Sequence, residues 1–233
     1  ADRLGLLVFA EIPAWQISKE AMKNPKVVAN MRQQLAELIN KLKNHPSVVV
    51  WSVGNECESD NEIARSVIGG LIQFVKEMDS TRPVTYVSSY IYSDDGWCRC
   101  LDLGDFTSIN AYFDVNIDKL NEVLERIHRE NPGRSILLTE FGAEAVRGLH
   151  GEFAGSEEHQ ADVVEKTFNL MVSKDYMLGG IVWSFTDYWH QARRLGTAYL
   201  NPVCYLHGIL NLDRRPKKSF GVLNKLFINT MDQ

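Results

Sequence analysis

The sequence predicts an α/β protein of the (β/α)8 barrel (TIM barrel) class, truncated to about six βα units. Short apolar runs rich in β-branched residues alternate six times with longer segments whose apolar residues recur at helical spacing. Those longer segments can each cross back over a parallel sheet. Two of the apolar runs end in a glutamate, Glu56 and Glu140. Barrels of this class carry their chemistry at the carboxyl ends of the strands, so the two glutamates are the first functional candidates.

Length and composition limit the classes of function. With 233 residues the chain can bury one sizeable core, and we expect residues 1–233 to form a single, partial barrel domain. A formal net charge of -5 predicts neither a nucleic-acid partner nor an anionic membrane surface. No apolar run approaches the length of a membrane span. The four cysteines fit neither a disulfide framework nor a zinc site, so we expect a reduced, cytoplasmic protein without metal or cofactor.

The first elements follow from local signals. Residues 1–5 are expected to form the last turn of a helix, because Gly5 is typical of a left-handed helix end. The apolar residues 6–10 then predict a strand. Helical spacing of apolar residues predicts a helix over residues 25–43, which Pro46 stops. Residues 48–53 form a mostly apolar run rich in β-branched residues, which predicts a strand buried on both faces.

The middle of the chain repeats this alternation. Asp60 or Asn61 is expected to cap a helix whose apolar positions extend from Ile63 to Val75. The following elements are predicted as a strand at 83–88, a loop at 89–104, a strand at 106–110, a helix at 117–131 and a strand at 135–140.

The last third contains fewer elements and longer loops. We predict a helix at 157–173, a final strand at 179–185 and, after a long loop, a closing helix at 216–227. The basic run at 214–218 opens that helix and is expected to be a solvated face.

Glu56 and Glu140 together predict a reaction class. Two acids at the same ends of two strands are expected to face each other across the mouth of the barrel. Glycoside hydrolysis needs such a pair, with one acid to protonate the leaving oxygen and one carboxylate to attack or to activate water. The alternative for Glu56 is an acid that only stabilises the positive end of a helix dipole.

Four motifs occur in a fixed order: His-Pro-Ser-Val at 45–48, Trp-Ser-Val-Gly-Asn-Glu at 51–56, Thr-Glu-Phe-Gly at 139–142 and Val-Trp-Ser-Phe at 182–185. With these motifs the chain resembles the catalytic (β/α)8 domain of family 2 glycoside hydrolases, the group of β-galactosidases and β-glucuronidases. The resemblance covers residues 4 to about 226. It implies that the family's first two βα units and its N-terminal sandwich domains are absent from this chain.

The resemblance also implies roles for individual residues. Glu56 matches the acid/base and Glu140 the nucleophile of a retaining mechanism. Asn55 matches a donor to the sugar 2-hydroxyl, and Tyr112 matches a tyrosine that hydrogen-bonds the nucleophile. Trp183 matches a tryptophan that forms the floor of the sugar site. The structural alternatives are that Tyr112 merely covers the end of the sheet and that Trp183 is part of the core.

Two further positions depart from the family pattern. Glu11 matches a residue that binds magnesium in some β-galactosidases, but the accompanying histidine is absent, so we expect Glu11 to contact substrate and not metal. Residues 205–207 (Tyr-Leu-His) stand where β-glucuronidases carry an Asn-x-Lys motif that binds the uronate carboxylate. His207 is therefore a substrate-binding candidate, and its presence favours a β-galactoside. A basic lining of the sugar site is still possible through His150, Arg193 and Arg194.

The expected function is a retaining β-glycosidase that cleaves terminal β-linked sugars, β-galactosides in particular, through a glycosyl-enzyme intermediate. One alternative is a β-glucuronidase or another family 2 exo-glycosidase. The other is an inactive fragment that acts only as a structural or carbohydrate-binding module. A β-linked carbohydrate is the expected partner, and exposed sheet edges would favour homo-oligomers.

Overall fold

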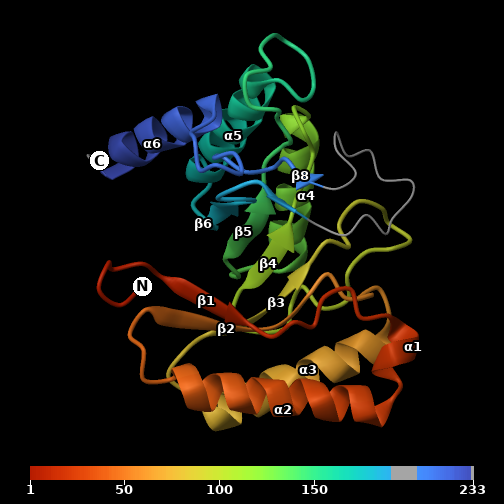
Figure 1. Cartoon of the computed structure of the whole chain (residues 1–233). Helices are drawn as coiled ribbons and strands as arrows, with labels where there is room; N and C mark the ends of the chain where they lie inside the picture. The colour runs from red at the N-terminus through yellow and green to blue at the C-terminus, as the bar shows by residue number, and fades with distance from the viewer. Residues whose placement is uncertain (190–203, 232–233) are drawn as a thin grey trace. The chain divides into compact units, whose positions relative to one another are not determined.

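The computed structural model describes residues 1–189 and 204–231 (Figure 1). Within them the larger sheet has six strands in the order β1-β2-β3-β4-β5-β6, which is also their order along the chain. The strands are β1 (Val8–Glu11), β2 (Val48–Asn55), β3 (Val84–Ser88), β4 (Thr107–Asn110), β5 (Ile136–Phe141) and β6 (Met177–Val182). Pairing from β1 through β4 is parallel. The predicted set of six strands is confirmed.

Helices lie between the strands as predicted, and β3 and β4 are joined without a helix in the described residues between them, in agreement with the loop predicted at 89–104. They are α1 (Lys19–Met22), α2 (Pro25–Leu42), α3 (Glu62–Met78), α4 (Ile117–Glu130), α5 (Glu157–Val172) and α6 (Lys218–Met231). A small antiparallel sheet pairs β7 (Tyr188–Trp189) with β8 (Cys204–Tyr205). Helix α1, β7 and β8 were not predicted, because one helical turn and two-residue strands are too short to produce a periodic pattern.

Side-chain caps explain where three of the helices begin. Asn24 caps α2 by accepting a hydrogen bond from the N–H of Lys26, and Pro25 occupies the first helical position, where no N–H is needed. Asn61, and not Asp60, caps α3. Helix α5 is capped by the hydroxyl of Ser156. Of the two residues predicted as possible caps of α3, Asn61 is the one whose side chain accepts a hydrogen bond from the helix.

The chain divides into two compact units, each described separately below. Unit 1 contains Ala1–Asn110 and Val123–Leu137. Unit 2 contains Ala111–Glu122 and the described part of Leu138–Gln233.

In unit 1, α2 and α3 lie side by side on one face of β1, β2 and β3 (Figure 1). The predicted apolar face of α2 buries Met31, Leu35 and Ile39. Strand β2 is buried along most of its length, and Val50 belongs to a buried apolar cluster that includes Phe106. These contacts remove apolar surface from water and fix the direction in which the carboxyl end of β2 points.

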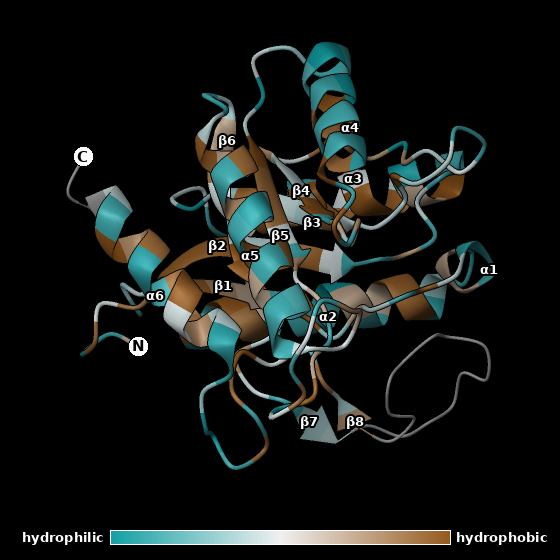
Figure 2. Ribbon diagram, turned by 90° about the horizontal axis from the view of Figure 1, so that it is seen from above, coloured by the Kyte–Doolittle hydropathy of each residue, from teal (hydrophilic) through white to brown (hydrophobic). Residues whose placement is uncertain are grey.

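In unit 2, α5 and α6 lie side by side, and the rings of Phe168 and Phe227 meet edge to face with centroids 5.8 Å apart (Figure 1). Figure 2 shows β1, β2 and β5 mainly in the colour of hydrophobic residues, whereas α4 carries hydrophilic residues along much of its length. That contrast is expected for strands inside a protein and a helix with one face in water. Among the described residues no helix has the length and apolar character needed to cross a membrane.

Two strand boundaries differ from the prediction. Strand β1 begins at Val8, two residues later than expected, and β6 ends at Val182 instead of continuing to residue 185. Beyond Val182 the backbone takes other partners: the N–H of Ser184 donates to the carbonyl oxygen of His207 at 3.0 Å, and the N–H of Ile209 donates to the carbonyl oxygen of Ser184 at 2.9 Å. Tertiary hydrogen bonds therefore end the strand while its apolar pattern continues.

The basic run at 214–218 is not a uniformly solvated face, which corrects the prediction. Lys217 is 2% exposed, and its Nζ lies 2.8 Å from Oδ1 of Asp187. The ammonium group is buried because this carboxylate and two carbonyl oxygens replace its water. A residue 30 positions away in the chain supplies the counter-charge, and no local charge pattern could reveal that.

Candidate active site

Glu56 follows directly on β2 in unit 1 and has an uncommon backbone conformation. Its φ is 53°, in the left-handed region that residues with a side chain seldom adopt. The N–H of Glu56 donates to the carbonyl oxygen of Val87 in β3 at 2.9 Å. The neighbouring strand thus fixes the backbone from which the Glu56 side chain departs.

The carboxylate of Glu56 accepts three hydrogen bonds from side chains of unit 1. Nδ2 of Asn110, the last residue of β4, donates to Oε1 at 3.0 Å. The indole Nε1 of Trp15 donates to Oε2 at 3.0 Å, and Nε2 of Gln16 donates to the same oxygen at 3.3 Å. Three N–H donors from two separate segments therefore determine how this carboxylate is oriented.

Asn55 is linked to Glu56 through Asn110. The side-chain Oδ1 of Asn55 accepts a 3.0 Å hydrogen bond from Nδ2 of Asn110. The Asn55 amide oxygen thus acts as an acceptor toward Asn110, and its Nδ2 group acts as a donor. That polarity agrees with the predicted donation from Asn55 to a sugar hydroxyl.

Glu11 is the last residue of β1 and lies in the same unit. Its Oε2 accepts a 2.7 Å hydrogen bond from Oγ of Ser52. Displacement of water by surrounding protein raises the pKa of Glu11, and the negative charge of Glu56 raises it further against the opposing effect of the Ser52 hydrogen bond. A nearby negative charge raises the pKa of a carboxyl group, so Glu56 favours the protonated form of Glu11.

Glu140 lies near the carboxyl end of β5 in unit 2 and is held by Tyr112. The phenol Oη of Tyr112 donates to Oε2 of Glu140 at 2.7 Å, a normal length for an O–H···O hydrogen bond. The N–H of Ala111 donates to the carbonyl oxygen of Glu140 at 2.9 Å. Backbone and side-chain bonds thus both connect the segment after β4 to Glu140.

Trp183 follows β6, and its backbone lies against the end of β5. Its N–H donates to the carbonyl oxygen of Phe141 at 2.9 Å. A Cβ atom on Gly142, whose φ is +142°, would lie only 2.8 Å from the carbonyl oxygen of Trp183. Glycine is required in the Thr-Glu-Phe-Gly motif because the backbone after β6 approaches this closely. Trp183 is 36% exposed, so it is not a plain core residue.

His207 packs edge to face on Tyr112, with ring centroids 5.8 Å apart. Its side chain is only 13% exposed, and Nδ1 lies 3.7 Å from Oε1 of Glu144. Burial, followed by the positive charge of Lys217, lowers the pKa of His207 to about 4. The imidazole is therefore neutral at pH 7, and its Nδ1 has no hydrogen-bond partner among the described residues.

A buried ion pair supports the segment that carries His207. Nζ of Lys217 lies 2.8 Å from Oδ1 of Asp187 and donates to the carbonyl oxygen of Leu206 at 2.9 Å. The N–H of Gly208 donates to the same Asp187 oxygen at 2.9 Å. The residues before and after His207 are thus hydrogen-bonded to the Lys217–Asp187 ion pair.

The predicted site residues fall into two groups, one in each unit. Unit 1 holds Glu56, Asn55 and Glu11, and unit 2 holds Glu140, Tyr112, Trp183 and His207. Asn110 connects Asn55 with Glu56, and Tyr112 contacts both Glu140 and His207. Arg193 and Arg194 lie outside the described residues.

Sequence reasoning missed three residues that contact Glu56. Asn110 had a usable signal, because it is a polar residue at the end of an apolar strand, as Asn55 is. Trp15 and Gln16 lie in an irregular loop, and their contacts with Glu56 span 41 and 40 positions in the chain. No local pattern indicates such contacts.

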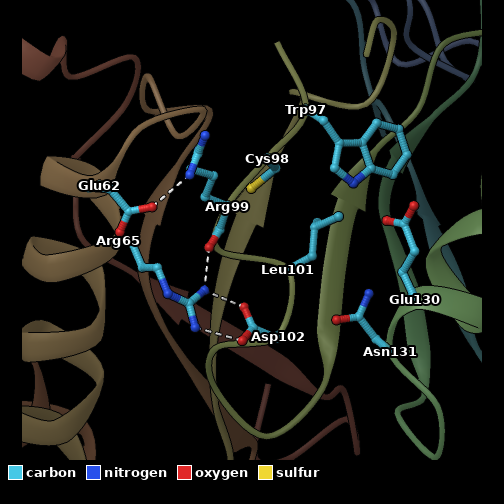
Figure 3. Close-up of a pocket in the computed structure, with 9 residues that line it drawn as sticks. All are labelled: Glu62, Arg65, Trp97, Cys98, Arg99, Leu101, Asp102, Glu130 and Asn131. Atoms are coloured by element: carbon cyan, nitrogen blue, oxygen red, sulfur yellow. Dashed lines mark hydrogen bonds and ion pairs between the residues drawn. The ribbon is translucent and has the colours of Figure 1, made fainter. Parts of the chain in front are cut away.

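A pocket of about 430 Å³ lies elsewhere in unit 1 (Figure 3). Its lining residues are Glu62, Arg65, Trp97, Cys98, Arg99, Leu101, Asp102, Glu130 and Asn131. The two arginines are already paired, Arg65 with Asp102 at 2.5 and 2.7 Å and Arg99 with Glu62 at 2.7 Å. The seven predicted site residues, all within the described part of the chain, are not among its lining residues, so this pocket is separate from the candidate site.

Comparison with known proteins places these observations in a family context. Residues 1–231 match the family described as glycosyl hydrolases family 2, TIM barrel domain. A β-glucuronidase from Mus musculus is 29% identical over 239 residues, which cover 97% of this chain and 36% of the mouse protein.

Two solved structures are similar over nearly the whole chain. A GH2 β-galacturonidase from Eisenbergiella tayi bound to galacturonate has a TM-score of 0.85 and 27% identity, covering 96% of this chain and 40% of its own. Bifidobacterium dentium β-glucuronidase complexed with coumarin-3-O-glucuronide also has a TM-score of 0.85 and 27% identity, with 96% and 37% covered. This chain thus spans about two fifths of the length of these relatives.

Proposed function

Because the chain belongs to glycosyl hydrolase family 2 through its TIM barrel domain, we propose that the protein is a retaining β-glycosidase. Glu56 serves as the acid/base and Glu140 as the nucleophile. The fold of the chain is that of a truncated TIM barrel with six strands. Barrels of this class use residues at the carboxyl ends of their strands, where both glutamates are found.

One observation carries the proposal: each strand-end glutamate is oriented by donor side chains. Glu56 accepts from Asn110 at 3.0 Å, and Glu140 accepts from Tyr112 at 2.7 Å. Acids that only stabilised helix ends would instead accept from backbone N–H groups of those helices. Orientation by side chains is what a catalytic carboxylate requires.

The proposed reaction has two displacements. The Glu140 carboxylate attacks the anomeric carbon while Glu56 protonates the departing oxygen, and a glycosyl ester forms on Glu140. Glu56 then removes a proton from a water molecule, which displaces Glu140 and restores both groups. The mechanism requires the two carboxyl groups to lie about 5–5.5 Å apart.

For the substrate, we infer a β-linked uronide. The expected preference for β-galactosides is not supported, because the matched relatives are named β-glucuronidases and a β-galacturonidase. In this chain Tyr205 and His207 stand at the positions of the Asn-x-Lys motif. Since the His207 pKa is lowered to about 4, its imidazole would bind a uronate carboxylate through an N–H donor and not as a cation.

The test uses the full-length protein that carries this chain. Turnover is measured on 4-nitrophenyl β-glucuronide, β-galacturonide, β-galactoside and β-mannoside. We expect the highest kcat/KM on one of the two uronides. Faster turnover of the galactoside would contradict the substrate proposal while leaving the reaction class in place.

The roles of the two glutamates are tested on the best substrate of that panel. Glu140→Gln is expected to lower kcat by about 10³-fold or more, because the nucleophile is lost. Glu122→Gln is the matched control, since Glu122 is 66% exposed on α4. Turnover by Glu140→Gln at the wild-type rate would contradict the assignment.

A further inference from the structure

We propose that Trp15 and Gln16, on the loop after β1, are positioning residues for the acid/base Glu56 and that together they select which of its oxygens carries the transferred proton. This inference rests on the proposed function, because it takes Glu56 to be the acid/base. Its basis is the arrangement of three hydrogen bonds around one carboxylate within unit 1.

The loop that carries both residues is fixed to the end of β2 by backbone hydrogen bonds. The N–H of Asn55 donates to the carbonyl oxygen of Ala14 at 2.9 Å, and the N–H of Gln16 donates to the carbonyl oxygen of Asn55 at 3.0 Å. Trp15 and Asn55 form a parallel bridge between these bonds. The loop therefore extends the sheet next to Glu56, and the two donors do not depend on a flexible surface segment.

The approach of the loop to the end of β2 is close, so small residues are favoured at the contact. A Cβ atom on Gly54 would lie 3.2 Å from the carbonyl oxygen of Ala14, and Sγ of Cys57 donates to that same oxygen at 3.4 Å. Gln16 and Glu56 have φ values of 52° and 53°. The donor and the acceptor of the 3.3 Å hydrogen bond are therefore both in the left-handed region. Backbone conformations of this kind persist only where surrounding contacts stabilise them.

The exposure of Trp15 argues against a role in the core. The residue is 55% exposed, although tryptophan is among the residues that gain most from burial. What the structure does provide for the indole is an acceptor, Oε2 of Glu56 at 3.0 Å. The ring is therefore placed by its N–H group and by the docked loop, and not by apolar packing.

The three donors divide the two oxygens of Glu56 unequally. A carboxylate has about four lone-pair positions, two on each oxygen. Trp15 and Gln16 occupy both positions on Oε2, while Asn110 occupies one of the two on Oε1. Among the described residues, the remaining position on Oε1 is the one open to a proton, and from there the proton passes to the leaving oxygen.

The inference predicts an effect that depends on the leaving group. When the departing alcohol is a weak acid, bond cleavage needs the proton from Glu56; when it is a strong acid, bond cleavage needs little help. Loss of a donor to Oε2 lets the carboxyl group rotate and puts the proton in the wrong place. The loss in kcat/KM should therefore grow as the leaving group becomes less acidic. A structural defect would lower both rates equally.

The experiment compares two aryl glycosides of the preferred sugar, one with 2,4-dinitrophenol and one with 4-methylphenol as the leaving group. Trp15→Phe keeps the ring and removes the N–H group. Gln16→Asn keeps a residue that tolerates positive φ and shortens the donor. Trp97→Phe, at the separate pocket, is the matched control for loss of an indole. Glu56→Ala gives the full effect of removing the acid.

For Trp15→Phe and Gln16→Asn we expect kcat/KM on the 4-methylphenyl substrate to fall about tenfold, with less than about a twofold change on the dinitrophenyl substrate. Equal losses on both substrates, or no loss on either, would overturn the inference. If Glu56→Ala shows the selective loss and both loop variants do not, the positioning role alone fails. If Glu56→Ala also lacks the selective loss, the acid/base assignment fails with it.

Discussion

The phenol of Tyr112 donates a 2.7 Å hydrogen bond to Oε2 of Glu140, and the N–H of Ala111, the residue before Tyr112, donates to the carbonyl oxygen of that same glutamate. The segment that follows β4 is therefore bound to both the backbone and the side chain of the proposed nucleophile. Under the proposed function, this relationship holds the attacking oxygen in a fixed orientation.

Tyr112→Phe tests that relationship. Removing the hydroxyl leaves the backbone bond of Ala111 in place and deletes one hydrogen bond to a charged group. Because such a bond contributes about 1.5–3 kcal/mol, kcat/KM should fall about 10- to 100-fold. The thermal midpoint measured alongside should change little. A variant with unchanged kcat/KM would show that Tyr112 only covers the end of the sheet.

Gly142→Ala tests the close approach between β5 and the backbone of Trp183. The new Cβ would lie 2.8 Å from the carbonyl oxygen of Trp183, at a φ of +142°. Gly148→Ala is the control, since Gly148 also has a positive φ of +84° but has no atom within 4 Å of its Cβ position. We expect Gly148→Ala to lower the free energy of unfolding by about 1–2 kcal/mol and Gly142→Ala by about 1–3 kcal/mol more. Urea unfolding of both variants measures the difference, and equal losses would mean that the contact with Trp183 relaxes freely.

Lys217→Met tests the buried ion pair. Asp187 would keep its hydrogen bond from Gly208 but lose its counter-charge, which should lower the free energy of unfolding by about 3–5 kcal/mol. Lys218→Met is the control, because Lys218 is 50% exposed and its pair with Glu158 should contribute less than about 1 kcal/mol.

Combining Lys217→Met with Asp187→Asn completes the test of this pair. The double variant should recover much of the loss, because it no longer buries an unpaired charge. If the double variant is as unstable as Lys217→Met alone, packing of the lysine stem and not charge accounts for the effect.

His207 gives the fold a pH dependence of defined sign. Its pKa is lowered to about 4 by burial and by Lys217, whereas an exposed histidine titrates near 6.5. Between these values the unfolded chain binds a proton that the folded chain does not. The free energy of unfolding is therefore not affected by this group above about pH 6.5. It decreases as the pH falls from about 6.5 toward 4, by about 3 kcal/mol in total.

The measurement is urea unfolding at several pH values between 7 and 4 for the wild type and for His207→Gln. Other groups titrate in both proteins, so only the difference between the two curves reports on His207. The difference should change steadily in favour of the variant as the pH falls. Parallel curves would mean that protonated His207 is stabilised in the fold, for which Glu144 at 3.7 Å is the available partner.

The positions of the regular elements could largely be predicted from the sequence. Helix α2 was expected at 25–43 and spans Pro25–Leu42, because one apolar face, a capping residue and a proline all indicate the same bounds. The end of β6 could not be predicted. Its apolar pattern continues through Phe185, but Ser184 pairs with the backbone around His207, which lies 23 residues later in the chain.

Site residues at the end of a strand could be predicted from the sequence, whereas site residues on a loop could not. Glu56 and Glu140 follow apolar runs, so their placement follows from the rule that barrel chemistry lies at the carboxyl ends of strands. Trp15 and the burial of Lys217 depend on partners 41 and 30 positions away. Contacts over such separations are set by the fold as a whole, and local sequence carries no signal for them.

The central claim, a glycosyl ester on Glu140, is tested most directly by trapping it. The reagent is a 2-deoxy-2-fluoro-glycosyl fluoride of the preferred sugar. Its fluorine at C2 slows both displacements, but the fluoride at the anomeric carbon is a good leaving group in the first displacement. The covalent intermediate should therefore accumulate. Peptide mapping by mass spectrometry then locates the added sugar. We predict one added sugar, on the peptide that contains Glu140, and none on Glu140→Gln. A label on any other residue, or rapid turnover of the reagent to a product of inverted configuration, would contradict the account.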